Sequence, residues 1–192
     1  MLEQFRETLN KVIILDDQEW RIISEAFEIK KVAARQLITE IGNVEDRLYF
    51  VIKGVLRLYC LDVKEQKTTI FLFSENHFAS CYQSFLTGAP SDQALETLEE
   101  CILLSIQKEN FESLYSKVPK MNVLTRVIAE QRFIHAQHIF TGQISRTPEE
   151  RYRDFEQTQG NLLLRVPQHI IASFLGITPV SLSRIRNRAL KK

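Results

Sequence analysis

The stretch that decides how this chain folds spans residues 171–186: Ile171-Ala-Ser-Phe-Leu-Gly-Ile-Thr-Pro-Val-Ser-Leu-Ser-Arg-Ile-Arg186. Gly176 can take the positive φ at which a helix ends. Thr178 followed by Pro179 is typical of an N-cap and a first helical residue. We therefore predict one helix over about 167–175 and a second that begins at Pro179. This arrangement is a helix-turn-helix.

The second predicted helix separates apolar from polar side chains. Leu182 and Ile185 point inward at a spacing of i, i+3, and Ala172 is small where the first helix must approach them. The outer face suits the major groove of DNA, where such a helix meets base edges and flanking cations meet phosphates. The predicted base contacts are Val180, Ser181 and Arg184, the last suited to guanine. The predicted phosphate contacts are Thr178, Arg186, Arg188, Lys191 and Lys192.

Charge is divided unevenly along the chain. The 192 residues carry a formal net charge of only +1. Residues 161–192 hold six basic and no acidic side chains, which leaves 19 basic against 24 acidic ones, or −5, in residues 1–160. A +6 segment on an acidic body indicates a polyanionic partner at that end. The alternative is an αα-hairpin with a solvated basic face, but the caps, the small alanine and the charge all favour a helix-turn-helix.

A long helix is predicted upstream, from about Met121 to Ser145, with a length of roughly 37 Å. Its apolar residues form two rows, which indicates packing on two sides, against its own domain and against a second copy of the chain. The alternative is one wide core face in a monomer. The residues predicted for the dimer helix are Leu124, Ile128, Ala129, Phe133, Ala136 and Phe140.

A domain boundary is predicted directly after the long helix. Thr147, Pro148 and Glu150 match an N-cap, a first helical residue and the glutamate of a capping box. A shorter helix is therefore expected through about Gln157, ending at residues 159–161.

Residues 28–106 are rich in short β-type runs. Examples are Leu48–Ile52, Val55–Tyr59 and Thr68–Phe73, with Lys53-Gly54 as a tight-turn signal between the first two. Several short strands at close spacing indicate a β-barrel or a sandwich.

The N-terminal sequence and the cysteines indicate the cellular compartment of the protein. The first twenty residues do not read as a signal peptide, and no apolar run reaches the ~20 residues of a membrane span. Cys60, Cys81 and Cys101 are few and far apart, which indicates reduced thiols in a cytoplasm. No C-x-x-C pair supports zinc or an iron–sulfur cluster. We expect a cytoplasmic protein with no membrane partner and no metal.

Groups that could perform catalysis are sparse. His135 and His138 share a helix face at a spacing that can hold a metal, but no third ligand follows, so a polar stretch of the dimer helix is the favoured interpretation. The barrel region offers only His77, and Ser80 and Ser84 have no base in a recognisable motif. We predict no catalytic residues and no enzyme activity; a barrel enzyme is the least favoured class.

The whole chain resembles the Crp/Fnr family of bacterial transcription regulators. Leu48–Tyr59 looks like the barrel signature of the family's cyclic-nucleotide-binding-type β-roll. The predicted helix over 121–145 resembles its dimerisation helix, and Ile171–Arg186 resembles its helix-turn-helix.

This resemblance implies an α+β fold in three parts. An N-terminal β-roll or jelly-roll sensor with flanking helices would occupy 1–118, a long dimerisation helix 119–145, and a helix-turn-helix domain with a truncated wing 146–192. The implied function is a sequence-specific transcription regulator that binds a pseudo-palindromic site in double-stranded DNA as a homodimer. RNA polymerase and an unknown small-molecule effector are further implied partners. The alternative is a small-ligand-binding β-roll module whose basic tail binds an acidic protein.

The effector region departs from the family pattern. Members that bind cyclic nucleotides carry a Gly-Glu pair and an Arg, where this chain reads Phe78-Ala-Ser80 and Pro90-Ser-Asp-Gln93. No Lys or Arg occurs between Lys67 and Lys108, and a buried phosphate without a cation is costly. Members with an oxygen-sensing cluster use cysteines near the N-terminus, whereas the first here is Cys60. We therefore predict that neither a cyclic nucleotide nor a cluster is bound. The candidate pocket residues are Phe78, Ala79, Ser80, Ser91 and Asp92.

Overall fold

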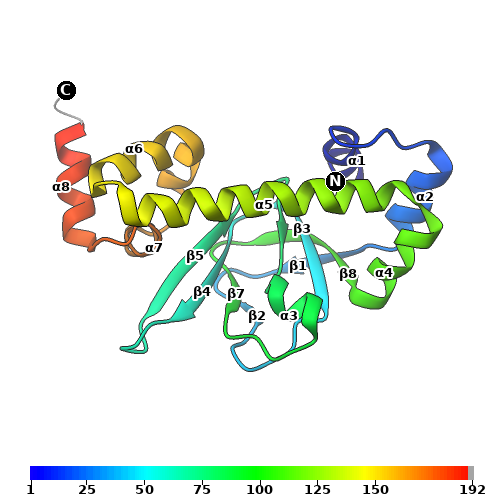
Figure 1. Ribbon diagram of the computed structural model, residues 1–192, viewed down its shortest axis with the longest axis horizontal. Coiled ribbons are helices and arrows are strands. Elements are labelled where there is room, and N and C mark those ends of the chain that lie inside the picture. The colour runs from blue at the N-terminus through cyan, green and yellow to red at the C-terminus, as the bar shows by residue number, and fades with distance from the viewer. Residues whose placement is uncertain (190–192) are drawn as a thin grey trace. The chain divides into compact units, whose positions relative to one another are not determined.

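The predicted β-type runs form two four-stranded sheets in the computed structural model, which describes residues 1–189 (Figure 1). In order, one sheet contains β1 (Glu28–Val32), β8 (Cys101–Gln107), β3 (Arg47–Lys53) and β6 (Phe78–Ala79). The other contains β2 (Leu37–Thr39), β7 (Ala94–Thr97), β4 (Leu56–Leu61) and β5 (Lys67–Phe73). The expected β-roll is confirmed.

The turn at Gly54 carries the chain from one sheet to the other. It joins β3 and β4, which lie in different sheets, so it does not close a hairpin. Gly54 has φ +107, a conformation that side chains rarely adopt. A Cβ on Gly54 would overlap Cys101 Sγ and lie 2.9 Å from the backbone oxygen of Glu100. Glycine is therefore required here by both backbone conformation and space.

Gly54→Ala is expected to destabilise the fold by about 2–3 kcal/mol, because backbone strain and overpacking act together. Gly88→Ala is the matched control, since Gly88 also has positive φ, at +72, but nothing lies within 4 Å of the added Cβ. That control should cost only about 1 kcal/mol. Urea unfolding of the two variants measures the difference. Equal costs would show that the close approach to Cys101 is unimportant.

The two units into which the chain divides are described separately. The first contains residues 1–58 and 72–131, and the second contains residues 59–71 and the described residues from 132 onward. The helices that begin in the first unit are α1 (Leu2–Asn10), α2 (Asp17–Glu25), α3 (Tyr82–Thr87), α4 (Lys108–Lys117) and α5 (Lys120–Ser145). Helix α5 continues into the second unit, where the remaining elements are α6 (Pro148–Gln159), the 3-10 helix η1 (Gly160–Leu164), α7 (Gln168–Phe174) and α8 (Pro179–Ala189).

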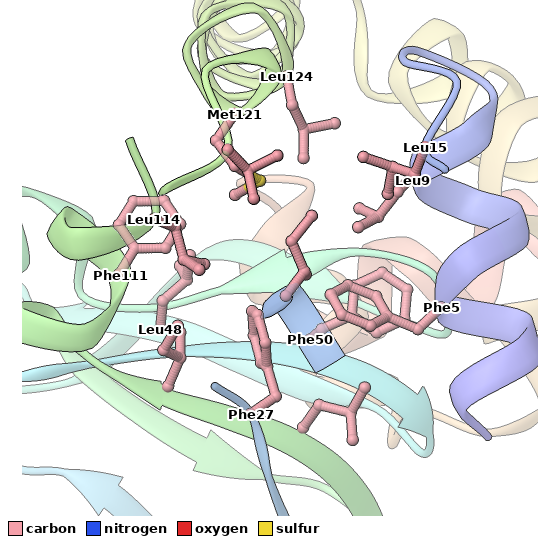
Figure 2. Packing of buried hydrophobic residues seen from close by; sticks show 14 of the residues in the cluster. Phe5, Leu9, Leu15, Phe27, Leu48, Phe50, Phe111, Leu114, Met121 and Leu124 are labelled. Carbon is pink, nitrogen blue, oxygen red and sulfur yellow. The ribbon is translucent and has the colours of Figure 1, made fainter. Parts of the chain in front are cut away.

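The core of the first unit gathers aromatic and aliphatic side chains from helices and strands (Figure 2). The ring of Phe5 lies 4.7 Å from that of Phe50 and 4.9 Å from that of Phe27, measured between centroids. Met121 and Leu124 at the start of α5 are buried in the same cluster. The long helix is thereby anchored to the β-roll by its first turns.

The C-terminal elements begin and end where the local signals place them. Thr147 and Glu150 form the predicted capping box at the start of α6. Gly176 has φ +65 after α7, and the backbone N–H of Ser181 donates to Thr178 Oγ1 at 3.1 Å at the start of α8. Among the described residues, no helix combines the length and hydropathy that a membrane span requires.

Candidate nucleic-acid interface

Helix α8 presents a polar face to solvent and an apolar face to its own unit. Leu182 and Ile185 are buried, as predicted from their spacing. Val180 is 60% exposed, and Arg184 is exposed one turn further along. The side chains on this outer face are Val180, Ser183, Arg184 and Asn187, spaced i, i+3, i+4 and i+7.

The other predicted contact residues occupy different settings. Ser181 is half-buried, and its hydroxyl lies 3.0 Å from Thr178 Oγ1 within the cap. Arg186 is half-buried near Tyr152, while Arg188 Nη1 lies 3.4 Å from Glu149 Oε1. The predicted contacts Lys191 and Lys192 lie outside the described residues.

Ser183 and Asn187 are outward-facing residues of α8 that the sequence interpretation missed. The signal was available, because i, i+3, i+4 and i+7 from Val180 lie on one helix face. The basic character of the segment favoured Arg186 and Arg188 instead, which α6 partly engages.

The helix-turn-helix is held by bonds to the C-terminal end of α7. Gln143 Nε2 of α5 donates to the carbonyl oxygen of Phe174 at 3.1 Å, and Arg151 Nε of α6 donates to that of Leu175 at 2.8 Å. These carbonyls lack partners within their own helix. The arrangement fixes the turn that precedes α8.

A second anchor joins α7 to the β4–β5 segment within the same unit. The backbone N–H of Thr69 donates to Ser173 Oγ at 2.9 Å, and that hydroxyl donates to the carbonyl oxygen of Lys67 at 3.3 Å. Strand β5 lies at the edge of its sheet, so these backbone groups have no neighbouring strand on that side. Ser173 therefore takes the place of a strand partner.

The residues predicted for the dimer helix divide into two sets. Leu124 is buried and Ile128 partly buried against the core of the first unit. Ala129, Phe133 and Phe140 are exposed, with Phe133 at 63% and Phe140 at 68%. Ala136, which is half-buried, and Ile144, which is 73% exposed, extend the same side of α5. We call Ala129, Phe133, Ala136, Phe140 and Ile144 the apolar stripe.

The candidate effector residues use their polar atoms within the fold. Phe78 packs its ring 5.1 Å from that of Phe50, and Ala79 is fully buried. Ser80 is also fully buried, and its hydroxyl donates to the carbonyl oxygen of Arg47 at 3.1 Å. The hydroxyl of Ser91 donates to the Gln93 carbonyl at 2.8 Å, whereas Asp92 is exposed.

The β-roll contains a buried ion pair that the sequence interpretation did not identify. Arg57 is 6% exposed, and its Nε lies 2.5 Å from Glu96 Oε1 across β4 and β7. Among residues 1–189, Arg57 is the only Lys or Arg that is buried. Its charge is balanced by a carboxylate of the chain itself.

Glu45 is a second buried ionisable residue that the sequence interpretation did not identify. It is 3% exposed, and its carboxylate accepts hydrogen bonds from the Thr39 hydroxyl and, at 3.1 Å, from the backbone N–H of Arg47. A further bond comes from the backbone of Cys81. Burial nevertheless raises the pKa of Glu45 above its ordinary value, because desolvation outweighs these bonds.

A pH-dependent stability follows from Glu45. The folded state holds this proton more tightly than the unfolded chain, so stability is greatest below the ordinary pKa of 4.5 and is lost as pH rises through the raised value. Glu45→Gln lacks this titration. Between pH 4 and pH 8 the unfolding free energy of the wild type should therefore fall relative to that of the variant. Urea unfolding across that range measures it; a constant difference would contradict the raised pKa.

The two histidines of α5 have protein partners. His138 Nε2 lies 2.8 Å from Asp154 Oδ2, and the ring of His135 lies 5.9 Å from that of Phe71. Within residues 1–189, no group of three His, Cys, Asp or Glu side chains is placed to hold a metal ion.

Comparison with known proteins defines the class. Residues 29–118 match the family described as the cyclic nucleotide-binding domain. No curated protein sequence matches the chain significantly. The structure of FixK2 from Bradyrhizobium japonicum is similar with a TM-score of 0.77 and 14% identity, over 86% of this chain and 85% of that one.

Two further structures extend the likeness. The c-di-GMP-responsive global regulator CLP of Xanthomonas campestris has a TM-score of 0.72 and 16% identity, over 92% of each chain. A regulator assigned to the Crp/Fnr family from Eubacterium rectale has a TM-score of 0.70 and 17% identity, over 92% of this chain and 85% of that one. The chain thus contains a cyclic nucleotide-binding-type domain and has the fold of the Crp/Fnr transcription regulators, which confirms the predicted resemblance and α+β fold.

Proposed function

We propose that this protein is a homodimeric regulator of transcription that binds DNA sequence-specifically and needs no cyclic nucleotide. It is a regulator rather than an enzyme, and it acts in a bacterial cytoplasm where its DNA lies. That RNA polymerase and a small-molecule effector are partners of this protein remains a prediction.

The observation that carries DNA binding is the outer face of α8. A capped helix that follows a tight turn shows a guanidinium, an amide, a hydroxyl and an isopropyl group to solvent. In the major groove, a guanidinium can bond guanine and an amide can bond adenine. A hydroxyl can bond either of these bases, and an isopropyl group can contact the methyl group of thymine. Nothing in the hydrophobic core requires polar groups of this variety on that face.

The apolar stripe of α5 supports a dimer. Three of its side chains, Phe133, Phe140 and Ile144, are more than 60% exposed, and they recur on one side of the helix. Large apolar groups in such a row are typical of a seam between two helices. A twofold dimer would present two copies of α8 to half-sites about 34 Å apart, which favours a pseudo-palindromic operator.

Independence from cyclic nucleotides is supported by the charges of the β-roll. A buried cyclic phosphate needs a cation or a set of free N–H donors. The buried guanidinium of Arg57 is already paired with Glu96, and the Ser80 hydroxyl is bonded to the backbone. Thermal-shift measurements with cyclic AMP and cyclic GMP should show no stabilisation. A clear shift would overturn this part of the proposal.

Arg184→Ala tests the DNA-binding role. Removal of a bidentate hydrogen bond to guanine is expected to weaken a specific site by about 1–3 kcal/mol per half-site. The site comes from gel-shift selection with a genomic fragment library. Arg188→Ala is the control, because a residue that binds only phosphate should, when removed, weaken binding to all sequences alike. A wild-type protein with no sequence preference at any salt concentration would refute the function.

A further inference from the structure

We infer that Asn187 is a specificity-determining residue that reads an adenine in the base pair next to the guanine read by Arg184. The inference rests on the proposed DNA-binding function and adds a base preference to it.

The position of Asn187 on α8 carries the first step. Asn187 lies on the same exposed face as Val180, Ser183 and Arg184, at the i+7 position from Val180. In homeodomains, which are another class of DNA-binding protein, the helix in the major groove contacts bases through residues spaced i, i+3, i+4 and i+7. All four positions of α8 are therefore placed to face one groove, and Asn187 is the last of them.

The free hydrogen-bonding capacity of Asn187 carries the second step. Within residues 1–189 neither Asn187 nor Arg184 has a side-chain hydrogen bond or ion pair, whereas Arg188 Nη1 lies 3.4 Å from Glu149 Oε1. A carboxamide offers a donor and an acceptor side by side, which matches N7 and the N6 amino group of adenine. Of the groups on this face, only the amide has that complementarity.

The spacing between the two residues sets which base pair is read. Three residues of helix correspond to a rise of about 4.5 Å, close to the ~3.4 Å between stacked base pairs. Arg184 and Asn187 can therefore reach adjacent base pairs from one helix orientation. Each half-site should contain a G·C pair beside an A·T pair.

If Asn187 had only a structural role, its replacement would change stability and leave the base preference unchanged. The side chain of Asn187 is exposed, and alanine is a better helix former than asparagine. Asn187→Ala should therefore leave thermal stability unchanged or slightly higher. A change in DNA preference at unchanged stability would then come from the missing hydrogen bonds to the base.

The experiment is a selection from a randomised duplex library, followed by affinity measurements for every single-base change in the selected site. Wild type, Asn187→Ala and Arg184→Ala are compared as full-length proteins. Asn187→Ala is expected to lower the preference for adenine at one position of each half-site about tenfold and to leave the neighbouring guanine preference intact. Arg184→Ala should give the reverse pattern.

A second substitution of Asn187 distinguishes a changed base preference from a general loss of DNA binding. Asn187→Asp retains only acceptors, so preference at the same position should move from adenine toward cytosine, whose N4 amino group donates. The inference is overturned if the wild-type protein selects a specific site and neither Asn187 variant changes the base preference there. A wild type without any specific site would instead refute the proposed function itself.

Discussion

The double variant Phe133→Glu/Phe140→Glu is expected to be monomeric and to lose specific DNA binding. Both rings are more than 60% exposed on the apolar stripe of α5. In a twofold dimer, four added carboxylates would be brought together in an apolar seam, where unpaired charge costs several kcal/mol. Light scattering and sedimentation measure the assembly state. Affinity for a two-half-site duplex should fall at least a hundredfold, because one chain contacts only one half-site.

Ile134→Glu is the matched control for this prediction. Ile134 is 64% exposed on the same helix but lies about 100° around it from Phe133. The control should therefore stay dimeric and bind DNA as the wild type does. If the double variant remained dimeric, or if Ile134→Glu dissociated the dimer equally well, the apolar stripe would not be the seam.

Glu96→Leu is expected to destabilise the protein by about 3–5 kcal/mol, because it removes the carboxylate that is paired with the buried guanidinium of Arg57. The two side chains are 8% and 13% exposed, so water cannot replace the missing carboxylate. Urea or thermal unfolding measures the loss of stability.

The double variant Arg57→Met/Glu96→Leu separates charge pairing from packing. Replacing both partners with apolar groups removes both buried charges together, so most of the stability should return. If Glu96→Leu alone caused no loss of stability, the pair would not be a structural element of the β-roll.

Local signals in the sequence predicted the C-terminal elements well. Gly176, Thr178 and the Thr147–Glu150 capping box each act within a few residues, and each is confirmed. The strand runs were also recognisable because strands have their own short-range pattern. These signals depend on neighbours in the chain and need no knowledge of the tertiary fold.

Contacts between distant segments could not be predicted in the same way. The tight turn at Gly54 was recognisable from the sequence, but the placement of β3 and β4 in different sheets was not. Glu96 pairs with a residue 39 positions away, and Ser173 bonds the backbone of Thr69, 104 positions away. No pattern in one sequence reveals such partners, because they arise from how sheets and helices pack. The outer face of α8 could have been predicted in full, because the helical spacing of Val180, Ser183, Arg184 and Asn187 is present in the sequence.

A spacing series on the selected site tests the central claim most directly. Wild-type protein is titrated with duplexes whose two half-sites are separated by the natural spacing, by about 5 additional base pairs, or by about 10, which are half a turn and one turn of DNA. A twofold dimer that reads successive major grooves predicts two chains per duplex at the natural spacing and a loss of specific affinity of at least a hundredfold with the half-turn insertion. Equal affinity for all spacings and for a scrambled duplex would contradict it.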